Sequence, residues 1–330
     1  MDENRIHEKI FINIGNTRQG MFIVGENINN PVLLFLHGGP GMPTFFLEKQ
    51  YPTGLAQHFT VCYWEQTGGG FSFSPEISPE EMSVERIVND AIEVTKYLRQ
   101  RFGKEKIYLM GHSWGSLIGI LTSARAPHLF EAYIGVAQIT NQSESEKLAF
   151  KYMLDKYTEA GNRGMVSKFG SYNLENGKTE IIRFFKSPLR DKTMHELGIG
   201  TMHGMKSVIS GVFIPFMTSK HYSITERINL WRAKMLLLNK TKLIEELFSH
   251  NFPDEIPKLA IPVYFLSGIH DLTVNYELSR EYLKKIDAPV KGFYTFEKSA
   301  HSPMHEEPAR FIDIMREDVK MKSNKLADAF

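Results

Sequence analysis

Short apolar runs recur along the first 140 residues and again after residue 256, and glycine, proline or polar residues bound each of them. Continuous runs of this length are typical of strands buried on both faces of a parallel sheet. The segments 9–14 and 21–24 lie on either side of a glycine-containing turn and predict an antiparallel pair at a sheet edge. We therefore expect eight strands, at residues 9–14, 21–24, 32–36, 58–64, 106–110, 130–137, 261–266 and 292–296.

Segments with the spacing of amphipathic helices lie between several of these apolar runs. Apolar residues between 84 and 98 share one face of a helix, and Ser83 is suited to be its N-cap. Residues 276–286 and 308–321 read as two further helices. Alternation of strand and helix is the signature of right-handed crossovers. The predicted fold class is α/β, with a mostly parallel eight-stranded sheet and helices on both faces.

The alternation stops between residues 139 and 255, where the pattern is helical and irregular. We expect a helical cap domain over 139–255, inserted into a core domain made of 1–138 and 256–330. Segments 202–205 and 213–217 are rich in methionine, histidine and aromatic residues. Two interpretations stay open for them, a substrate pocket lining and simple packing of the cap on the core.

Composition excludes several classes of protein. The 330 residues are 42% hydrophobic and 23% charged, and 39 Lys and Arg against 38 Asp and Glu leave a net charge of +1. This balance argues against nucleic acid and anionic membranes as partners. The first nine residues lack the apolar run of a signal peptide, and no run is long enough to span a membrane, which predicts a cytoplasmic protein. The single cysteine, Cys62, is expected to be buried and inert.

A G-x-S-x-G pattern at residues 111–115 lies between the apolar run 106–110 and a helix-like run at 117–121. In this context the serine stands on a sharp strand-to-helix turn, and the glycines keep side chains away from the point where the chain folds back. Serine is a weak nucleophile unless a histidine base and an orienting acid assist it. Ser113 is therefore a candidate nucleophile that requires two partners.

Candidates for both partners follow later strands. Asp271 comes just after the strand at 261–266, and His301 lies in the loop after the strand at 292–296. The order serine, aspartate, histidine is that of α/β-hydrolases. His301 and His305 have a spacing found in zinc sites but lack the glutamate of H-E-x-x-H, so no metal is expected.

The segment H-G-G-P-G at 37–41 follows the buried strand at 32–36. Glycines at this point free backbone N–H groups to form an oxyanion hole, although an ordinary turn has the same composition. Together with 111–115, 268–271 and 300–308, this segment resembles the proline iminopeptidase branch of the α/β-hydrolases. The resemblance covers the core and not the cap.

The resemblance implies a role for each matching residue. Ser113 would be the nucleophile, His301 the base and Asp271 the residue that orients the base. The backbone N–H groups of Gly39 and Trp114 would form the oxyanion hole. The resemblance also implies the α/β-hydrolase fold with a helical cap and no cofactor.

The function expected from this resemblance is removal of N-terminal proline, or of another small apolar residue, from short peptides. A carboxylesterase or lactonase acting on small acyl substrates is the alternative, and a non-catalytic ligand-binding protein of this fold is a third possibility. Proline iminopeptidases bind the substrate amine with cap glutamates, and six acids of this chain are available for that role: Glu144, Glu146, Glu175, Glu180, Glu196 and Glu226. Thr67 stands where the family usually has an arginine.

Overall fold

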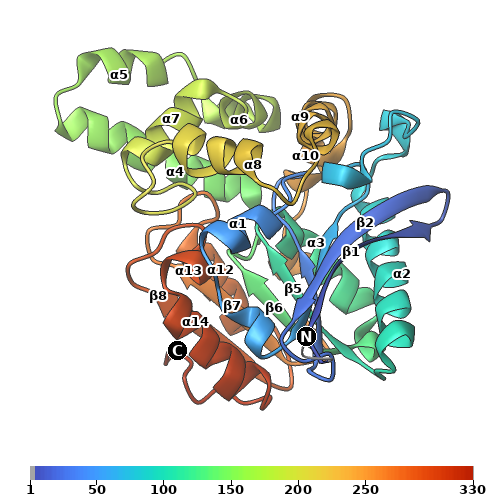
Figure 1. The fold of residues 1–330 in the computed structure, drawn as a ribbon. Helices are drawn as coiled ribbons and strands as arrows, with labels where there is room; N and C mark the ends of the chain where they lie inside the picture. The colour runs from blue at the N-terminus through green and yellow to red at the C-terminus, as the bar shows by residue number, and fades with distance from the viewer. Residues whose placement is uncertain (1–3, 330) are drawn as a thin grey trace.

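The computed structural model describes residues 4–329 and contains an eight-stranded sheet at its centre (Figure 1). The strand order is β1-β2-β4-β3-β5-β6-β7-β8. The β1–β2 and β2–β4 pairs are antiparallel and all other pairs are parallel. The strands are β1 (Ile6–Ile14), β2 (Thr17–Gly25), β3 (Val32–Leu36), β4 (Thr60–Glu65), β5 (Ile107–His112), β6 (Phe130–Val136), β7 (Val263–Gly268) and β8 (Lys291–Phe296). The expected fold class is confirmed.

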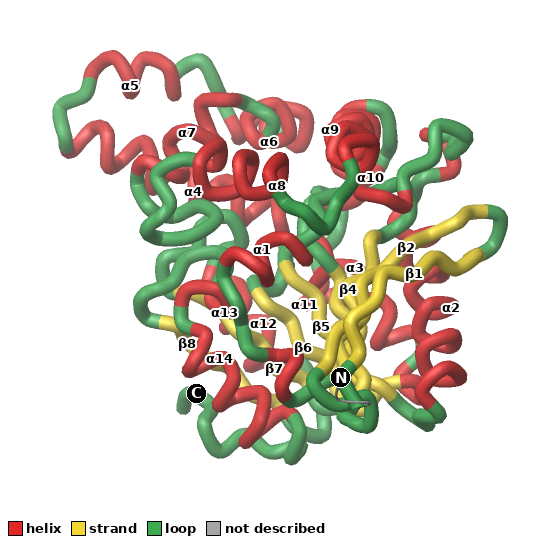
Figure 2. The backbone as a smooth tube through the Cα atoms, viewed as in Figure 1, coloured by secondary structure: helices red, strands yellow, loops and turns green. Residues whose placement is uncertain are grey.

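Alternate residues of each central strand enter opposite layers of the core. In β3, Leu34 and Leu36 pack with the layer formed by α2, α3 and α12, whereas Leu33 and Phe35 pack with the layer of α1 and α14. Figure 2 shows the strands lying between these helices. The helices are α1 (Phe45–Gln50), α2 (Val84–Phe102), α3 (Trp114–Arg125), α12 (Tyr276–Lys285), α13 (Pro303–Glu306) and α14 (Pro308–Ile314), with a π-helical turn at Met315–Val319.

Most differences from the expected elements lie at their ends. The edge hairpin is longer than its alternating segments suggested, because β1 pairs with β2 from Ile6↔Gly25 to Ile14↔Thr17. Ser83 caps α2 as expected, and its side chain accepts a hydrogen bond from the N–H of Arg86. Strand β7 is shifted by two residues and includes Gly268. Cys62 is buried, and burial raises the pKa of its thiol.

The segment between β6 and β7 is helical, and within the described residues it contributes no strand to the sheet. Its helices are α4 (Gln142–Glu159), α5 (Arg163–Phe169), α6 (Lys178–Phe185), α7 (Pro188–Glu196), α8 (Ile214–Thr218), α9 (Ile224–Asn239), α10 (Leu243–Leu247) and α11 (Phe252–Glu255). We call residues 139–255 the helical insertion. It lies at one end of the sheet, above the loops that follow β3, β5 and β8 (Figure 1).

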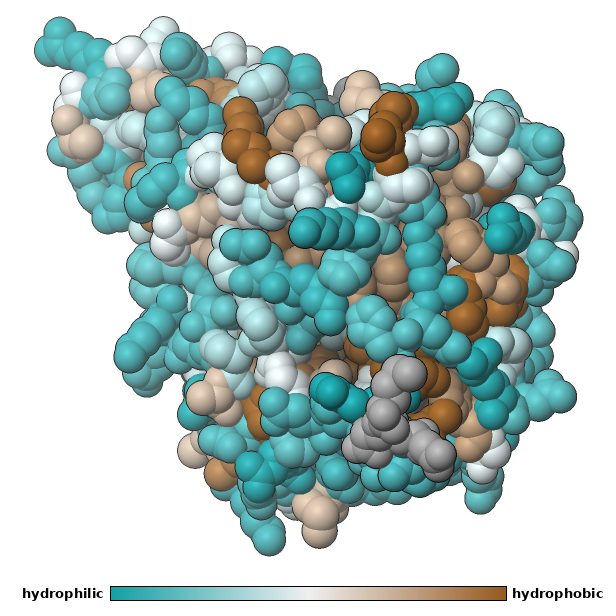
Figure 3. Space-filling model, in the orientation of Figure 1, coloured by the Kyte–Doolittle hydropathy of each residue, from teal (hydrophilic) through white to brown (hydrophobic). Residues whose placement is uncertain are grey.

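The surface is mainly hydrophilic, with hydrophobic side chains exposed on the helical insertion (Figure 3). The exposed large hydrophobic residues of the insertion around α8 and α9 are Ile209, Phe213, Ile214, Ile224, Ile228 and Met235. No helix within residues 4–329 has both the length and the apolar character needed to cross a membrane. Residues 1–3 and 330 of the expected core domain lie outside the described residues.

Candidate active site

Ser113 occupies a sharp corner between β5 and α3. Its backbone has φ 55° and ψ −123°, a conformation that side-chain-bearing residues rarely adopt. The N–H of Ser113 donates to the carbonyl of Val136 in the neighbouring strand at 3.0 Å, which holds the corner against the sheet. A strained backbone that the surrounding structure holds in place in this way is characteristic of a nucleophile elbow.

The glycines on either side make this corner sterically possible. A Cβ atom on Gly111 would lie 2.2 Å from the carbonyl oxygen of Gly115, and one on Gly115 would lie 2.0 Å from that of Leu36. Either contact is far inside van der Waals distance. The G-x-S-x-G pattern therefore reflects the close approach of α3 to β5 and β3.

Ser113 is also the only residue between 107 and 120 that is partly exposed, whereas all the others are buried. Its neighbours on β5 and α3 are packed in the core, so the corner brings one polar side chain to the surface of an otherwise closed region. A nucleophile needs this combination of a rigid base and access to substrate.

His301 and Asp271 form a buried pair. His301 Nδ1 lies 2.8 Å from Asp271 Oδ2, and the Asp271 side chain is completely buried. The other carboxylate oxygen, Oδ1, accepts the N–H groups of Thr273 and Val274 at 2.8 and 3.0 Å. Because a carboxylate favours the protonated Nδ1, the Nε2 atom of His301 is left with a lone pair that can accept a proton.

The His301 loop is attached to the serine corner through His112. His112 Nε2 donates to the His301 carbonyl at 2.8 Å, and the two imidazole rings have their centroids 5.0 Å apart. Burial keeps the pKa of His112 well below its usual value, so this residue is neutral. His112 immediately precedes Ser113, and the hydrogen bond therefore fixes the loop of the base beside the elbow of the nucleophile.

The loop after β3 lies on another side of Ser113. An ideal Cβ on Gly38 would be 3.4 Å from Cβ of Ser113, and Gly39 has φ 129°, a conformation that favours glycine. Among residues 4–329, no acceptor receives the N–H of Gly39. Trp114 is the first residue of α3, so its N–H has no acceptor within the helix. Both N–H groups are available to an external acceptor.

Gln66 connects this loop to the elbow, a role that the sequence analysis did not identify. Its backbone N–H donates to His37 Nε2 at 3.0 Å and its side-chain Nε2 to the His37 carbonyl at 2.9 Å. Its Oε1 accepts the indole N–H of Trp114 at 3.0 Å. Burial lowers the pKa of His37 to about 4, which keeps its Nε2 an acceptor. The feature of the sequence that could have identified Gln66 is its position next to the glycines at 68–70.

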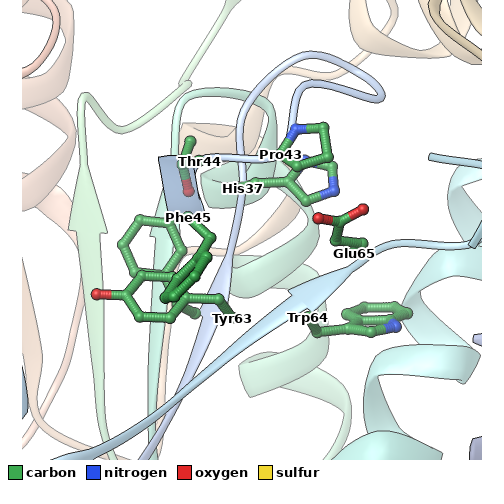
Figure 4. A pocket seen from close by; sticks show the side chains of 8 residues that line it. His37, Pro43, Thr44, Phe45, Tyr63, Trp64 and Glu65 are labelled. Atoms are coloured by element: carbon green, nitrogen blue, oxygen red, sulfur yellow. The ribbon is translucent and has the colours of Figure 1, made fainter. Parts of the chain in front are cut away.

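Glu65, the neighbour of Gln66, is a buried carboxyl group at the end of β4. Figure 4 shows its side chain turned toward His37 and Pro43 in a narrow pocket beside the loop after β3. Oε2 accepts the N–H of Phe71 and Oε1 accepts the hydroxyl of Tyr222, each at 2.6 Å. Burial raises the pKa of Glu65 to about 8.

Each of the six acids of the helical insertion that were candidates for binding a substrate amine is either exposed or paired with a cation. Glu146 is fully buried but forms a bidentate ion pair with Arg190, at 2.8 and 3.0 Å. Glu144 is exposed. The other four form ion pairs: Glu175 with Lys147, Glu180 with Arg183, Glu196 with Lys192 and Glu226 with Lys9. Within the described part of the chain, none of the six is a buried carboxylate that lacks a cation.

A second histidine, His305, and a second aspartate, Asp254, form hydrogen bonds with other residues. His305 Nδ1 donates to the carbonyl of Tyr51 at 2.7 Å, and burial lowers the pKa of His305 to about 4. Asp254 is exposed and accepts a hydrogen bond from Asn251. Among residues 4–329, no group of three or more His, Cys, Asp or Glu side chains is arranged to hold a metal ion.

Comparison with known proteins identifies the family of the chain. The chain matches the family described as alpha/beta hydrolase fold over residues 31–308. It is 33% identical, over 307 residues, to the probable aminopeptidase YbaC of Bacillus subtilis strain 168, and the match covers 92% of this chain and 93% of that protein. A proline iminopeptidase of Clostridioides difficile strain 630 is 23% identical over 299 residues, which are 89% of this chain and 92% of that protein.

A solved structure supports the fold independently. The crystal structure of proline iminopeptidase from Mycobacterium smegmatis superposes with a TM-score of 0.67, covering 95% of this chain and 98% of that one. The two chains are 16% identical, so this likeness concerns the fold. The sequence matches and the superposition both include the helical insertion, which the motifs of the core do not cover.

Proposed function

The chain belongs to the α/β-hydrolase family, in its proline iminopeptidase-like branch, and on this premise we propose that it is a serine hydrolase with Ser113 as its nucleophile. The observation that carries the proposal is the partly exposed Ser113 on its strained corner, with the buried His301–Asp271 pair in a loop tied to that corner by His112. The insertion at 139–255 acts as a cap domain on the core.

In the first half of the reaction, Ser113 Oγ attacks the acyl carbon of the substrate while Nε2 of His301 takes the hydroxyl proton. The N–H groups of Gly39 and Trp114 bind the oxygen that becomes negative. Asp271 stabilises the imidazolium form of His301 and does not itself take the proton. The bond to the leaving group then breaks, and His301 returns the proton to the departing nitrogen or oxygen.

In the second half, water replaces the leaving group. His301 removes a proton from this water as its oxygen attacks the acyl carbon of the ester formed with Ser113. Breakdown of the tetrahedral adduct returns the proton to Ser113 Oγ and releases the acid. No cofactor or metal is needed, because every proton is transferred through one imidazole.

For the substrate, we propose an N-terminal proline or another small apolar residue of a short peptide. The names of the relatives support this choice, since the probable aminopeptidase YbaC matches along nearly its whole length. One observation favours hydrolysis of small esters as a second candidate. An aminopeptidase must hold a substrate ammonium group next to the scissile carbonyl, and the six acids first considered for this are exposed or already paired with cations.

The discriminating assay compares a prolyl or alanyl naphthylamide having a free amine with its N-acetylated form, alongside short-chain nitrophenyl esters. An aminopeptidase cleaves the free-amine amide and loses most of its activity on acetylation, because the group that binds the amine is left without its partner. Turnover of the esters without turnover of any free-amine amide would leave the esterase as the function of the same site.

A further inference from the structure

Lys234 lies on the side of the helical insertion that covers the loop after β3. An ideal Cβ on Gly41 would be 4.0 Å from Cα of Lys234 and 2.6 Å from the side chain of Leu237, one turn further along α9. The same loop contains Gly39. Helix α9 therefore rests directly on the loop whose backbone N–H groups face the reacting carbonyl in the proposed mechanism.

The side chain of Lys234 is partly buried and has no anionic partner. Among residues 4–329, no carboxylate oxygen lies within 4.0 Å of its Nζ atom. Nζ lies 5.4 Å from the ring centroid of Trp231, one turn earlier on the helix. Burial lowers the pKa of Lys234, and Asp191 opposes this effect. A partly desolvated ammonium group next to an aromatic ring gains substantially from an anion.

Asp191 belongs to α7, another helix of the helical insertion. The segment that follows α7 reaches the base, since the carbonyl of Gly200 accepts the N–H of His301 at 3.2 Å. Helix α9 contacts the loop after β3, and the α7 segment contacts the His301 loop. Asp191 is the charged group that acts on Lys234, but its side chain is 66% exposed, so water screens its charge. Helix α9, which carries Lys234, therefore lies over one of the two loops beside Ser113.

We propose that Lys234 is a carboxylate-binding subsite, which pairs with the free C-terminal carboxylate of a dipeptide bound for hydrolysis at Ser113. The proposal rests on the proposed function and adds to it the substrate length. A dipeptide places its carboxylate only one residue beyond the scissile bond, whereas a longer peptide has a neutral peptide group at this point. The enzyme then prefers dipeptides with a free C-terminus.

The test uses prolyl-alanine and prolyl-alanine amide, which differ only in this carboxylate. The full-length enzyme should have a KM about 10-fold to 100-fold lower for the free acid, since a hydrogen bond to a charged group contributes roughly 1.5 to 3 kcal/mol and each 1.4 kcal/mol is about tenfold. Lys234→Met should abolish this difference by raising KM for the acid, with kcat little changed. Lys234→Arg should restore part of it.

Lys240→Met is the matched control, because Lys240 lies at the end of the same helix and is exposed. It should retain the preference of the unmodified enzyme. Equal KM values for the two dipeptides in the unmodified enzyme would overturn the subsite and leave the aminopeptidase proposal intact. So would a Lys234→Met variant that affects both substrates equally.

Failure of the aminopeptidase proposal gives a different result. If nitrophenyl butyrate is hydrolysed and neither dipeptide is, the subsite is measured by competition between this ester and either N-acetylalanine or N-acetylalanine amide. Inhibition by the acid at least about tenfold stronger than by the amide, lost in Lys234→Met, supports the carboxylate subsite. Equal inhibition by the two compounds overturns it.

Discussion

The hydroxyl of Tyr222 donates to Oε1 of Glu65 at 2.6 Å, and this bond joins the helical insertion to the end of β4. Both side chains are buried. Glu65 is followed directly by Gln66, which bonds to His37 and Trp114 beside the serine elbow. The insertion is thus fastened to the same short segment that orders the oxyanion loop.

Glu65 makes stability depend on pH. Its pKa is raised to about 8 in the folded protein by burial, from an ordinary 4.5. Between these two values the unfolded chain releases a proton that the folded protein keeps, so stability falls as pH rises from about 4.5 to 8. At roughly 1.4 kcal/mol per pKa unit, the loss is at most about 5 kcal/mol. Glu65→Gln should remove this contribution, so its melting temperature should decline less than that of the unmodified protein between pH 5 and pH 8.

Glu175→Gln is the control for this comparison, because Glu175 is an exposed acid paired with Lys147. Its melting curves should follow those of the unmodified protein at every pH. Parallel pH profiles for Glu65→Gln and the unmodified protein would show that the Glu65 carboxyl is not protonated in the folded state.

Ser113→Ala should abolish hydrolysis while preserving the fold. Removing the nucleophile of a triad lowers kcat by about three to six orders of magnitude, and the smaller side chain fits the same corner. The measurement is turnover of a nitrophenyl ester, with circular dichroism to verify the fold. A serine-directed fluorophosphonate should label the unmodified protein and not the variant. Labelling that persists in the variant would identify another nucleophile.

Two pairs of substitutions test the base and its orienter. His301→Ala and Asp271→Asn should each reduce kcat by about three orders of magnitude or more, because the proton acceptor is lost or its tautomer is wrong. His305→Ala and Asp254→Asn should retain kcat, since the first side chain bonds to the Tyr51 carbonyl and the second is exposed. The measurement is kcat for one ester across the four variants, and the reverse ranking would reject the assignment.

The strands and caps of the core follow from local pattern. Residues 32–36 are apolar at every position, and the structure buries all of them in the middle of the sheet. Ser83 is a good N-cap by chemistry alone. The start of β1 was not predictable in this way, because Ile6 and His7 are held by pairing with Gly25 and Val24 and not by alternation.

Contacts distant in sequence explain what the sequence left open. Whether an acid of the insertion was free to bind an amine depended on its partner, and Glu226 pairs with Lys9, 217 residues away. The same holds for Gln66, whose bonds reach His37 and Trp114. No spacing rule connects these positions. The sequence therefore predicted the serine elbow and the order of the triad candidates, but not the long-range hydrogen bonds and ion pairs around them.

The helical insertion contains a buried ion pair between Glu146 on α4 and Arg190 on α7. Arg190 donates two hydrogen bonds to Glu146, and the two side chains are 10% and 0% exposed. Removing the cation alone leaves a buried carboxylate without its partner, so Arg190→Met should reduce the free energy of unfolding by about 3 to 5 kcal/mol. Replacing both charges by apolar groups of similar volume avoids that penalty.

The double variant Glu146→Leu, Arg190→Met should therefore be more stable than Arg190→Met alone and close to the unmodified protein in denaturant unfolding. Lys151→Met is the control, because Lys151 forms an exposed ion pair with Asp155 on α4, and its loss should leave the denaturant midpoint nearly unchanged. A double variant less stable than the single one would mean that the pair is held by further polar contacts of Glu146. The insertion would then depend on its charges, and not on close packing, to keep α4 against α7.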